Sequence, residues 1–183
     1  MNSLQQALVF LVQNLFQLYL VIVLLRFLLQ VAKADFYNPL SQFIVRATRL
    51  PLTPLRRLVP GVGGFDLAAL ALALFVQIAM VIVVVLIKQG ALQPIPIVTG
   101  SVAGIIDMIC SIYFYTIFAA SICSFIPATH HHPAVILAWQ LVDPLLAPFR
   151  KLIPPMGGID ISPIFALLAI KVIMTLIHPL LIV

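Results

Sequence analysis

The sequence predicts an all-α membrane protein with four transmembrane helices, arranged as two tandem hairpins that repeat one another. Its composition indicates a lipid environment, because 63% of the 183 residues are hydrophobic and 8% are charged, with a mean hydropathy of +1.22. Soluble domains carry about 25% charged residues. Four long apolar stretches and one duplicated segment then give the number of helices and the repeat.

The duplicated segment reads PLRRLVPGVGGFD at 54–66 and PFRKLIPPMGGID at 148–160, which lie 94 positions apart. Seven of the thirteen residues are identical. Further upstream, Asn38-Pro39 aligns with His132-Pro133 in the same register. Such repetition predicts one structural unit written twice. We therefore expect a single membrane domain over 1–183, with repeat 1 at about 1–90 and repeat 2 at about 95–183.

The four apolar stretches lie near 4–29, 67–87, 97–126 and 161–183. Each is close to or above the roughly 20 helical residues that cross a hydrocarbon core. The first stretch has no Lys or Arg before it and no small-residue cleavage pattern after it. We therefore expect it to remain as a helix and not to act as a signal peptide.

The basic residues predict the orientation. Seven of them lie between the first and second or the third and fourth stretches, and the rest of the connections and termini offer only Lys88. By the positive-inside rule, both long connections are cytoplasmic and both termini lie outside a bacterial plasma (inner) membrane. Each hairpin returns to its starting side, so the repeats are parallel. The net charge of +5 then indicates anionic inner-leaflet lipids as partners and not nucleic acid.

Each long connection is expected to hold an interfacial helix and a Pro/Gly elbow. In the first, apolar residues at 40, 43, 44 and 47 have helical spacing, which predicts an amphipathic helix of about ten residues that ends before Pro51. Its counterpart at 133–141 is nearly all apolar and carries Trp139. Gly63-Gly64 and Gly157-Gly158 would then permit a sharp turn.

Four cations and two carboxylates of the duplicated segment are candidate site residues. Arg56, Arg57, Arg150 and Lys151 are expected to face anionic lipid phosphates, at about 1 kcal/mol each. Asp66 and Asp160 precede the next apolar stretch, where an aspartate caps a helix N-terminus and faces its dipole. Catalytic use of these aspartates is the weaker interpretation.

The doubled motif resembles the YggT family of small bacterial and plastid membrane proteins. The resemblance rests on the N-P or H-P step, the P-x-R-[RK]-x-[VI]-P turn and the G-G-x-D sequence, and it covers nearly the whole chain. The family pattern D-x-S-P is present at 160–163 but not at 66–69. For bacterial members the resemblance implies links to osmotic stress and the cell envelope, and for plastid relatives to maturation of a membrane cytochrome. It supplies no catalytic residue.

Polar residues inside the apolar stretches are functional candidates by default. The 94-residue offset aligns Lys171 with Gln77 and Asp107 with Gln13. We expect these side chains to point into the bundle, either as interhelical hydrogen bonds or as an ion path, and we hypothesise that Lys171 pairs with Asp107. Arg26, near the cytoplasmic end of the first span, can reach Asp66 or a lipid phosphate, although snorkelling is the simpler account.

The remaining residues predict no enzyme, no cofactor and no metal. Cys110 and Cys123 are too far apart on one helix to pair, and 130–132 is a run of three histidines that favours a polar loop over a metal site. Two functions stay open: a non-catalytic membrane scaffold or assembly factor with an unknown membrane partner, and a small oligomeric K⁺ or proton transporter or channel.

The topology can be tested by cysteine labelling in intact cells. A cysteine placed in the 34–64 connection should resist an impermeant maleimide, because that connection is expected to be cytoplasmic. A cysteine placed after Gln89 should react. Labelling in the reverse pattern would contradict the orientation.

Overall fold

The structure is a computed structural model that describes residues 2–61, 64–129, 131–152 and 160–181. These residues form α-helices and short 3-10 helices and include no strand, which confirms the all-α class. In chain order the elements are α1 (Ser3–Val31), α2 (Pro39–Leu58), α3 (Leu67–Ile87), α4 (Pro94–Ser124), η1 (Pro127–Thr129), α5 (Pro133–Leu152), α6 (Ser162–Ile177) and η2 (His178–Leu180).

Among the described residues, four helical segments are long and apolar enough to cross a membrane: α1, α3, α4, and α6 continued by η2. This confirms the four predicted apolar helices, and the bounds of α3 agree with the predicted 67–87. The last one is shorter than predicted, because α6 ends at Ile177. Pro179 has no backbone N–H to donate to the carbonyl of Thr175, so the α-helix ends before it and the chain continues as a 3-10 turn.

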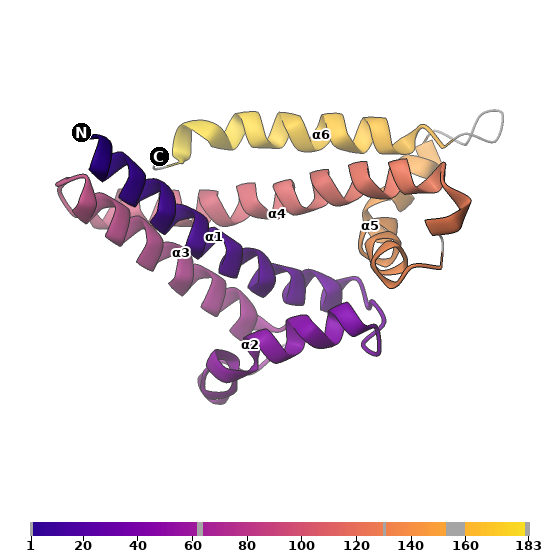
Figure 1. The fold of residues 1–183 in the computed structure, drawn as a ribbon, viewed down its shortest axis with the longest axis horizontal. Helices are drawn as coiled ribbons and strands as arrows, with labels where there is room; N and C mark the ends of the chain where they lie inside the picture. The colour runs from indigo at the N-terminus through magenta and orange to yellow at the C-terminus, as the bar shows by residue number, and fades with distance from the viewer. Residues whose placement is uncertain (1, 62–63, 130, 153–159, 182–183) are drawn as a thin grey trace.

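The apolar helices pack in two pairs, α1 with α3 and α4 with α6, and α3 also packs against α4. Figure 1 shows the α1–α3 pair inclined to the α4–α6 pair, with α2 and α5 lying across the helix ends. Two hydrogen bonds join the repeats near α2 and α5: Asn38 Nδ2 donates to Pro133 O at 2.8 Å, and Asp35 N donates to Gln140 Oε1 at 2.9 Å.

The two repeats bury many of the same positions. The bounds of α2 and α5 differ by 94 at both ends, since 39 plus 94 is 133 and 58 plus 94 is 152. Eight pairs of buried residues follow the same offset: Val9 and Ala103, Val23 and Ile117, Thr48 and Val142, Leu52 and Leu146, Ala68 and Ser162, Ala69 and Pro163, Leu72 and Ala166, and Val76 and Ile170. The sequence repeat is therefore also a repeat of packing.

The helices in the long connections are twice as long as predicted. The helix α2 does not end before Pro51 but continues through Pro51 and Pro54 to Leu58. Both prolines remove a backbone hydrogen bond, yet the carbonyls they release belong to Ala47 and Leu50, which are exposed and can be solvated. Beyond the first proline, fully buried Leu52 keeps the helix packed on the core.

Gln77 of α3 fills the space that Gly104 of α4 leaves. Gln77 is buried, and a Cβ on Gly104 would lie 2.2 Å from Gln77 Nε2 and 3.1 Å from its Cδ. Small residues allow close helix approach in membranes, where side-chain packing and interhelical hydrogen bonds drive association. This contact therefore sets how closely α3 of the first repeat meets α4 of the second.

We predict that Gly104→Leu destabilises the protein by about 1–3 kcal/mol through overpacking. Gln77→Ala in the same chain should restore part of the loss, because it removes the atoms that clash. Thermal unfolding in detergent measures both. Val102→Leu, on an exposed position of α4, is the control and should have little effect. If the double variant loses as much stability as the sum of the two single changes, the contact is not the cause.

Candidate functional site

An arginine–aspartate ion pair occurs at equivalent positions of both repeats. Arg56 donates to Asp66 Oδ2, and Arg150 Nε donates to Asp160 Oδ2 at 2.9 Å. In the first repeat the arginine lies in the last turn of α2 and the aspartate precedes α3. A cation near a helix C-terminus and an anion near an N-terminus each complement the helix dipole. The pair thus joins the end of one helix to the start of the next.

The two aspartates differ in their caps. Asp66 is the N-cap of α3, and its Oδ1 accepts a hydrogen bond from Ala69 N at 3.3 Å. Asp160 was also predicted to be an N-cap, but Ile161 holds that position. Asp160 Oδ1 instead accepts from Ser162 N at 2.9 Å. Because α6 begins at Ser162 with Pro163 in its first turn, the free N–H of Ser162 is the donor nearest to the carboxylate.

The four cations of the duplicated segment were predicted to face lipid phosphates, and this stays a prediction. Arg56 and Arg150 bind carboxylates of the protein, because the turn brings residues ten positions apart together. Arg57 and Lys151 are exposed. Gly64 has a φ of +85°, which glycine adopts readily. Gly63, Gly157 and Gly158 lie outside the described residues.

Arg26 of α1 connects three helices and does not snorkel. Its Nη1 donates to Val45 O at 3.0 Å and to Thr48 Oγ1 at 2.7 Å, both on α2. Its Nε lies 3.9 Å from Asp66 Oδ2, and its side chain is 10% exposed. The arginine is therefore held inside the protein by α2 and by the cap of α3.

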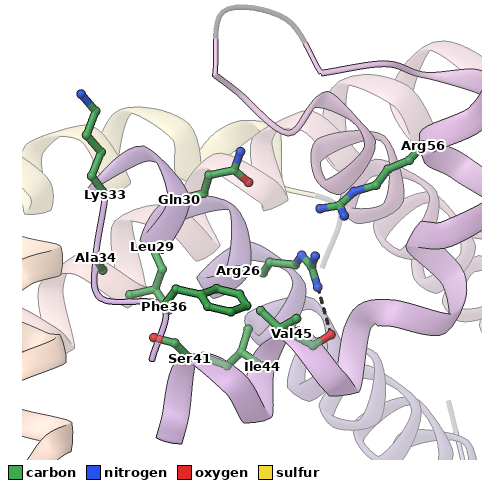
Figure 2. Close-up of a pocket in the computed structure, with 10 residues that line it drawn as sticks. All are labelled: Arg26, Leu29, Gln30, Lys33, Ala34, Phe36, Ser41, Ile44, Val45 and Arg56. Carbon is green, nitrogen blue, oxygen red and sulfur yellow. Dashed lines mark hydrogen bonds between the residues drawn. The ribbon is translucent and has the colours of Figure 1, made fainter. Parts of the chain in front are cut away.

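Arg26 and Arg56 line a pocket of about 430 Å³ between α1 and α2, which we call the basic pocket. Figure 2 shows the two guanidinium groups, which come from different helices, ending near one another, with Phe36 beside Arg26 and Lys33 extending away from it. Ser41 Oγ is buried and has no hydrogen-bond partner. The lining residues are Arg26, Leu29, Gln30, Lys33, Ala34, Phe36, Ser41, Ile44, Val45 and Arg56.

The corresponding region of the second repeat has the opposite balance of charge. Arg150 donates to both Asp143 and Asp160, whereas position 49, the counterpart of Asp143, is an arginine. Burial by itself would lower the pKa of Arg150, but its bonds to the two carboxylates outweigh this and raise the pKa above the ordinary value. Burial likewise would raise the pKa of Asp160, but contacts with Ser162 and Arg150 lower it.

The predicted pair of Lys171 and Asp107 does not form. Lys171 Nζ lies 4.9 Å from the centroid of the Phe114 ring, and no ion pair joins the two residues, both of which are described. Asp107 is seven residues from Phe114, or about 10 Å along α4. The prediction assumed that the outer ends of α4 and α6 are level, but α4 has 31 residues and α6 has 16.

The other polar residues of the spans lie in three kinds of surroundings. Gln77 is buried against Gly104, and Gln13 and Asp107 are half-buried. Lys171, in contrast, is exposed on the same face of α6 as Thr175, and His178 at the start of η2 is also exposed. The expectation that these residues point into the bundle is therefore wrong for α6, because α6 packs on one side only, against α4 and α5.

A groove of about 540 Å³ lies between α1 and α4, and we call it the axial groove. Four pairs of its lining residues are 94 positions apart: Asn14 and Met108, Gln17 and Ser111, Leu18 and Ile112, and Val21 and Tyr115. Equivalent positions of the two repeats thus face the same space, so the groove lies on the axis that relates them. Leu18 is 65% exposed and Tyr115 is 69% exposed, so the groove is open to the outside.

A smaller apolar pocket of about 300 Å³ continues the axial groove toward α2 and α5 and shares Leu25 and Thr116 with it. It also shares Leu29 and Ile44 with the basic pocket. Sequence reasoning missed all three cavities. For the axial groove and the apolar pocket, the signal was present only as pairs of residues at the 94-residue offset, which do not by themselves show which faces meet.

The family model described as CCB3/YggT matches residues 5–87 and again residues 99–181. Both ends of the second match are 94 residues beyond those of the first, the same offset as the duplicated segment. The chain belongs to the CCB3/YggT family. The resemblance predicted from the doubled motif is thus confirmed, and each match covers one repeat of the structure.

Relatives of this CCB3/YggT protein span nearly the same length. An uncharacterized protein of Pseudomonas aeruginosa is 43% identical over 175 residues, which are 94% of this chain and 89% of that protein. The uncharacterized YggT of Escherichia coli strain K12 is 37% identical over 166 residues, 91% of this chain and 86% of that one. A protein of Vibrio alginolyticus is 36% identical, with 88% and 86% covered. No solved structure matches the chain significantly.

The cysteines and histidines form no site among the described residues. Cys110 is buried and Cys123 half-buried, and both are free thiols. His132 Nδ1 accepts a hydrogen bond from Ala134 N at 3.2 Å, at the start of α5. No group of three metal-ligating side chains occurs in the described part of the chain. His130 lies outside it, so the absence of a metal or cofactor stays a prediction.

The two ion pairs should differ in their contribution to stability. Asp66→Ala removes a cap and leaves the nearly buried Arg26 without its carboxylate, so we predict a loss of about 3 kcal/mol. Asp160 is a third exposed, and Asp160→Ala should cost about 1 kcal/mol. Chemical unfolding in mild detergent measures both, with Arg57→Ala, at an exposed position, as the control. Equal losses at the two positions would show that Arg26 does not depend on Asp66.

Proposed function

We propose that this CCB3/YggT-family protein is a non-catalytic membrane scaffold or assembly factor, which holds a transmembrane segment of another membrane protein in the axial groove. The observation that carries the proposal is the polar lining of that groove. Asn14 and Gln17 are exposed in the middle of α1, and Tyr115 is exposed on α4. Both helices are apolar enough to span a membrane.

Side chains of this kind favour a protein neighbour over lipid. Lipid chains offer no hydrogen bonds, and a polar group without a partner in hydrocarbon is unfavourable. A transmembrane helix with Ser, Thr, Asn or Gln at the same depth would supply partners, each bond contributing about 0.6–2 kcal/mol. The inclined helix pairs leave the groove open along one side, which suits a helix that arrives from the bilayer.

The proposal includes an arrangement in the membrane. Both termini lie outside the bacterial plasma membrane, and the basic connections with α2 and α5 lie in the cytoplasm, by the positive-inside rule. Each repeat is then a parallel hairpin whose connecting helix lies in the interface. The link to osmotic-stress or cell-envelope physiology stays a prediction from the family resemblance.

A second candidate is the small oligomeric K⁺ or proton transporter. It is favoured by the polar face of α6, where Lys171 and Thr175 are exposed, with His178 also exposed at the start of η2. A charged residue at this depth is unfavourable by roughly 2.5–3.5 kcal/mol, and neighbouring copies could cover it around a water-filled path. The scaffold is the better-supported function because a groove with polar side chains from both α1 and α4 is already formed within one chain.

A photo-crosslinking amino acid at position 115, in the groove, tests the scaffold in native membranes. The same group at position 75 of α3 is the matched control, since Tyr115 and Phe75 are both 69% exposed and Phe75 lies outside the groove. We predict one discrete protein adduct from position 115 and none from 75. Gln17→Leu should reduce the yield several-fold, because it removes a hydrogen bond of the groove.

Liposome flux separates the two functions. The scaffold predicts no K⁺ or proton flux above that of empty vesicles. Equal crosslinking at positions 115 and 75 would contradict the groove as a docking site. Flux that is lost in Lys171→Met, with unchanged unfolding temperature, would support the transporter instead.

A further inference from the structure

We propose that the basic pocket of the first repeat binds the phosphate of one anionic phospholipid, whose acyl chain lies in the adjoining apolar pocket. The proposal does not depend on the scaffold function. It concerns a single built site, in contrast to the diffuse attraction of surface cations that the sequence predicted for the membrane surface.

The pocket has more positive than negative charge. Arg26 and Arg56 share one carboxylate, Asp66, and Lys33 lies at the rim. Arg56 is 46% exposed, so part of its guanidinium is free to meet a second anion. Arg26 is fixed by Val45 and Thr48 and needs little reordering to bind. A guanidinium has five donors in a planar fork that matches phosphate oxygens.

Ser41 supplies a second and independent observation. Its Oγ is buried in the wall of the same pocket and has no hydrogen-bond partner. Buried hydroxyl groups nearly always have a partner, because leaving one unpaired is unfavourable. An oxygen of a phosphate or of its headgroup in the pocket would provide this partner.

The apolar neighbour of the pocket distinguishes a lipid from free phosphate. Leu29 and Ile44 line both the basic pocket and the apolar pocket. Along α1, the basic pocket is lined by residues between 26 and 30, near the helix end, and the apolar pocket by residues between 22 and 29, nearer its middle. A phospholipid has its phosphate at the membrane surface and its acyl chains toward the membrane centre. The basic pocket and the apolar pocket follow one another along α1 in the same order.

The second repeat lacks this site and therefore serves as an internal control. The positions equivalent to Arg26, Lys33 and Ser41 are Ala120, Pro127 and Val135. Arg150, which is equivalent to Arg56, is bound by two carboxylates. We thus infer one anionic lipid for each chain, although the duplicated segment occurs twice.

The test uses the purified full chain in mild detergent, with native mass spectrometry and thermal unfolding as the readouts. The probes are phosphatidylglycerol, phosphatidylcholine and inorganic phosphate. We expect one retained phosphatidylglycerol and a raised unfolding temperature, with neither effect from phosphatidylcholine. In the double variant Lys33→Gln, Arg56→Gln the affinity should fall roughly thirtyfold, which is about 1 kcal/mol for each cation. A control change that also removes two cations, Arg150→Gln with Lys151→Gln in the second repeat, should leave the affinity unchanged.

Other results would overturn the proposal. Equal losses in the two double variants, or equal retention of the two lipids, would show diffuse attraction to the surface. If inorganic phosphate raises the unfolding temperature as much as phosphatidylglycerol does, the acyl chain does not contribute to binding. Ser41→Ala changes no charge, and we expect it to weaken phosphatidylglycerol binding several-fold. Unchanged phosphatidylglycerol binding in Ser41→Ala would show that the hydroxyl does not contact the lipid, which contradicts the proposed site. This variant also serves as the test if the first double variant does not fold.

Discussion

The carboxylate of Asp66 is the interaction on which the arrangement of the first repeat depends. It caps α3, receives Arg56 from the end of α2 and lies 3.9 Å from Arg26 of α1. Because Arg26 in turn donates to two oxygens of α2, three helices meet around one negative charge. A nearly buried carboxylate with two arginines is a stable arrangement only while all partners are present, so this junction fixes the angle at which α2 lies across the spans.

The two repeats share a backbone arrangement but carry different charges. Both repeats keep an arginine ten residues before an aspartate, and both bury the same apolar positions around it. The first repeat adds Arg26 and Lys33, while the second adds Asp143. The same backbone therefore presents an open basic pocket in one half and a neutralised arginine in the other.

The axial groove between the repeats exposes polar side chains within the apolar helices. Positions at the 94-residue offset face each other across the axial groove, and the chain leaves polar side chains exposed there in the middle of two apolar helices. The exposed Lys171 on α6 has the same character. Apolar surface needs no explanation in a membrane, but exposed polar surface does, since lipid offers no hydrogen bonds. These faces are where contacts with other molecules in the membrane are expected.

The sequence by itself determined the class, the four apolar helices and the family, because hydropathy and an ungapped repeat are properties of the chain that need no knowledge of packing. It also placed Asp66 beside the start of α3, since capping is a local interaction. Only the tertiary structure decided that α2 continues through Pro51 and that Lys171 lies over Phe114 and not beside Asp107. Contacts of this kind depend on the level and the face at which two helices meet. Neither can be read from the spacing of residues along one chain.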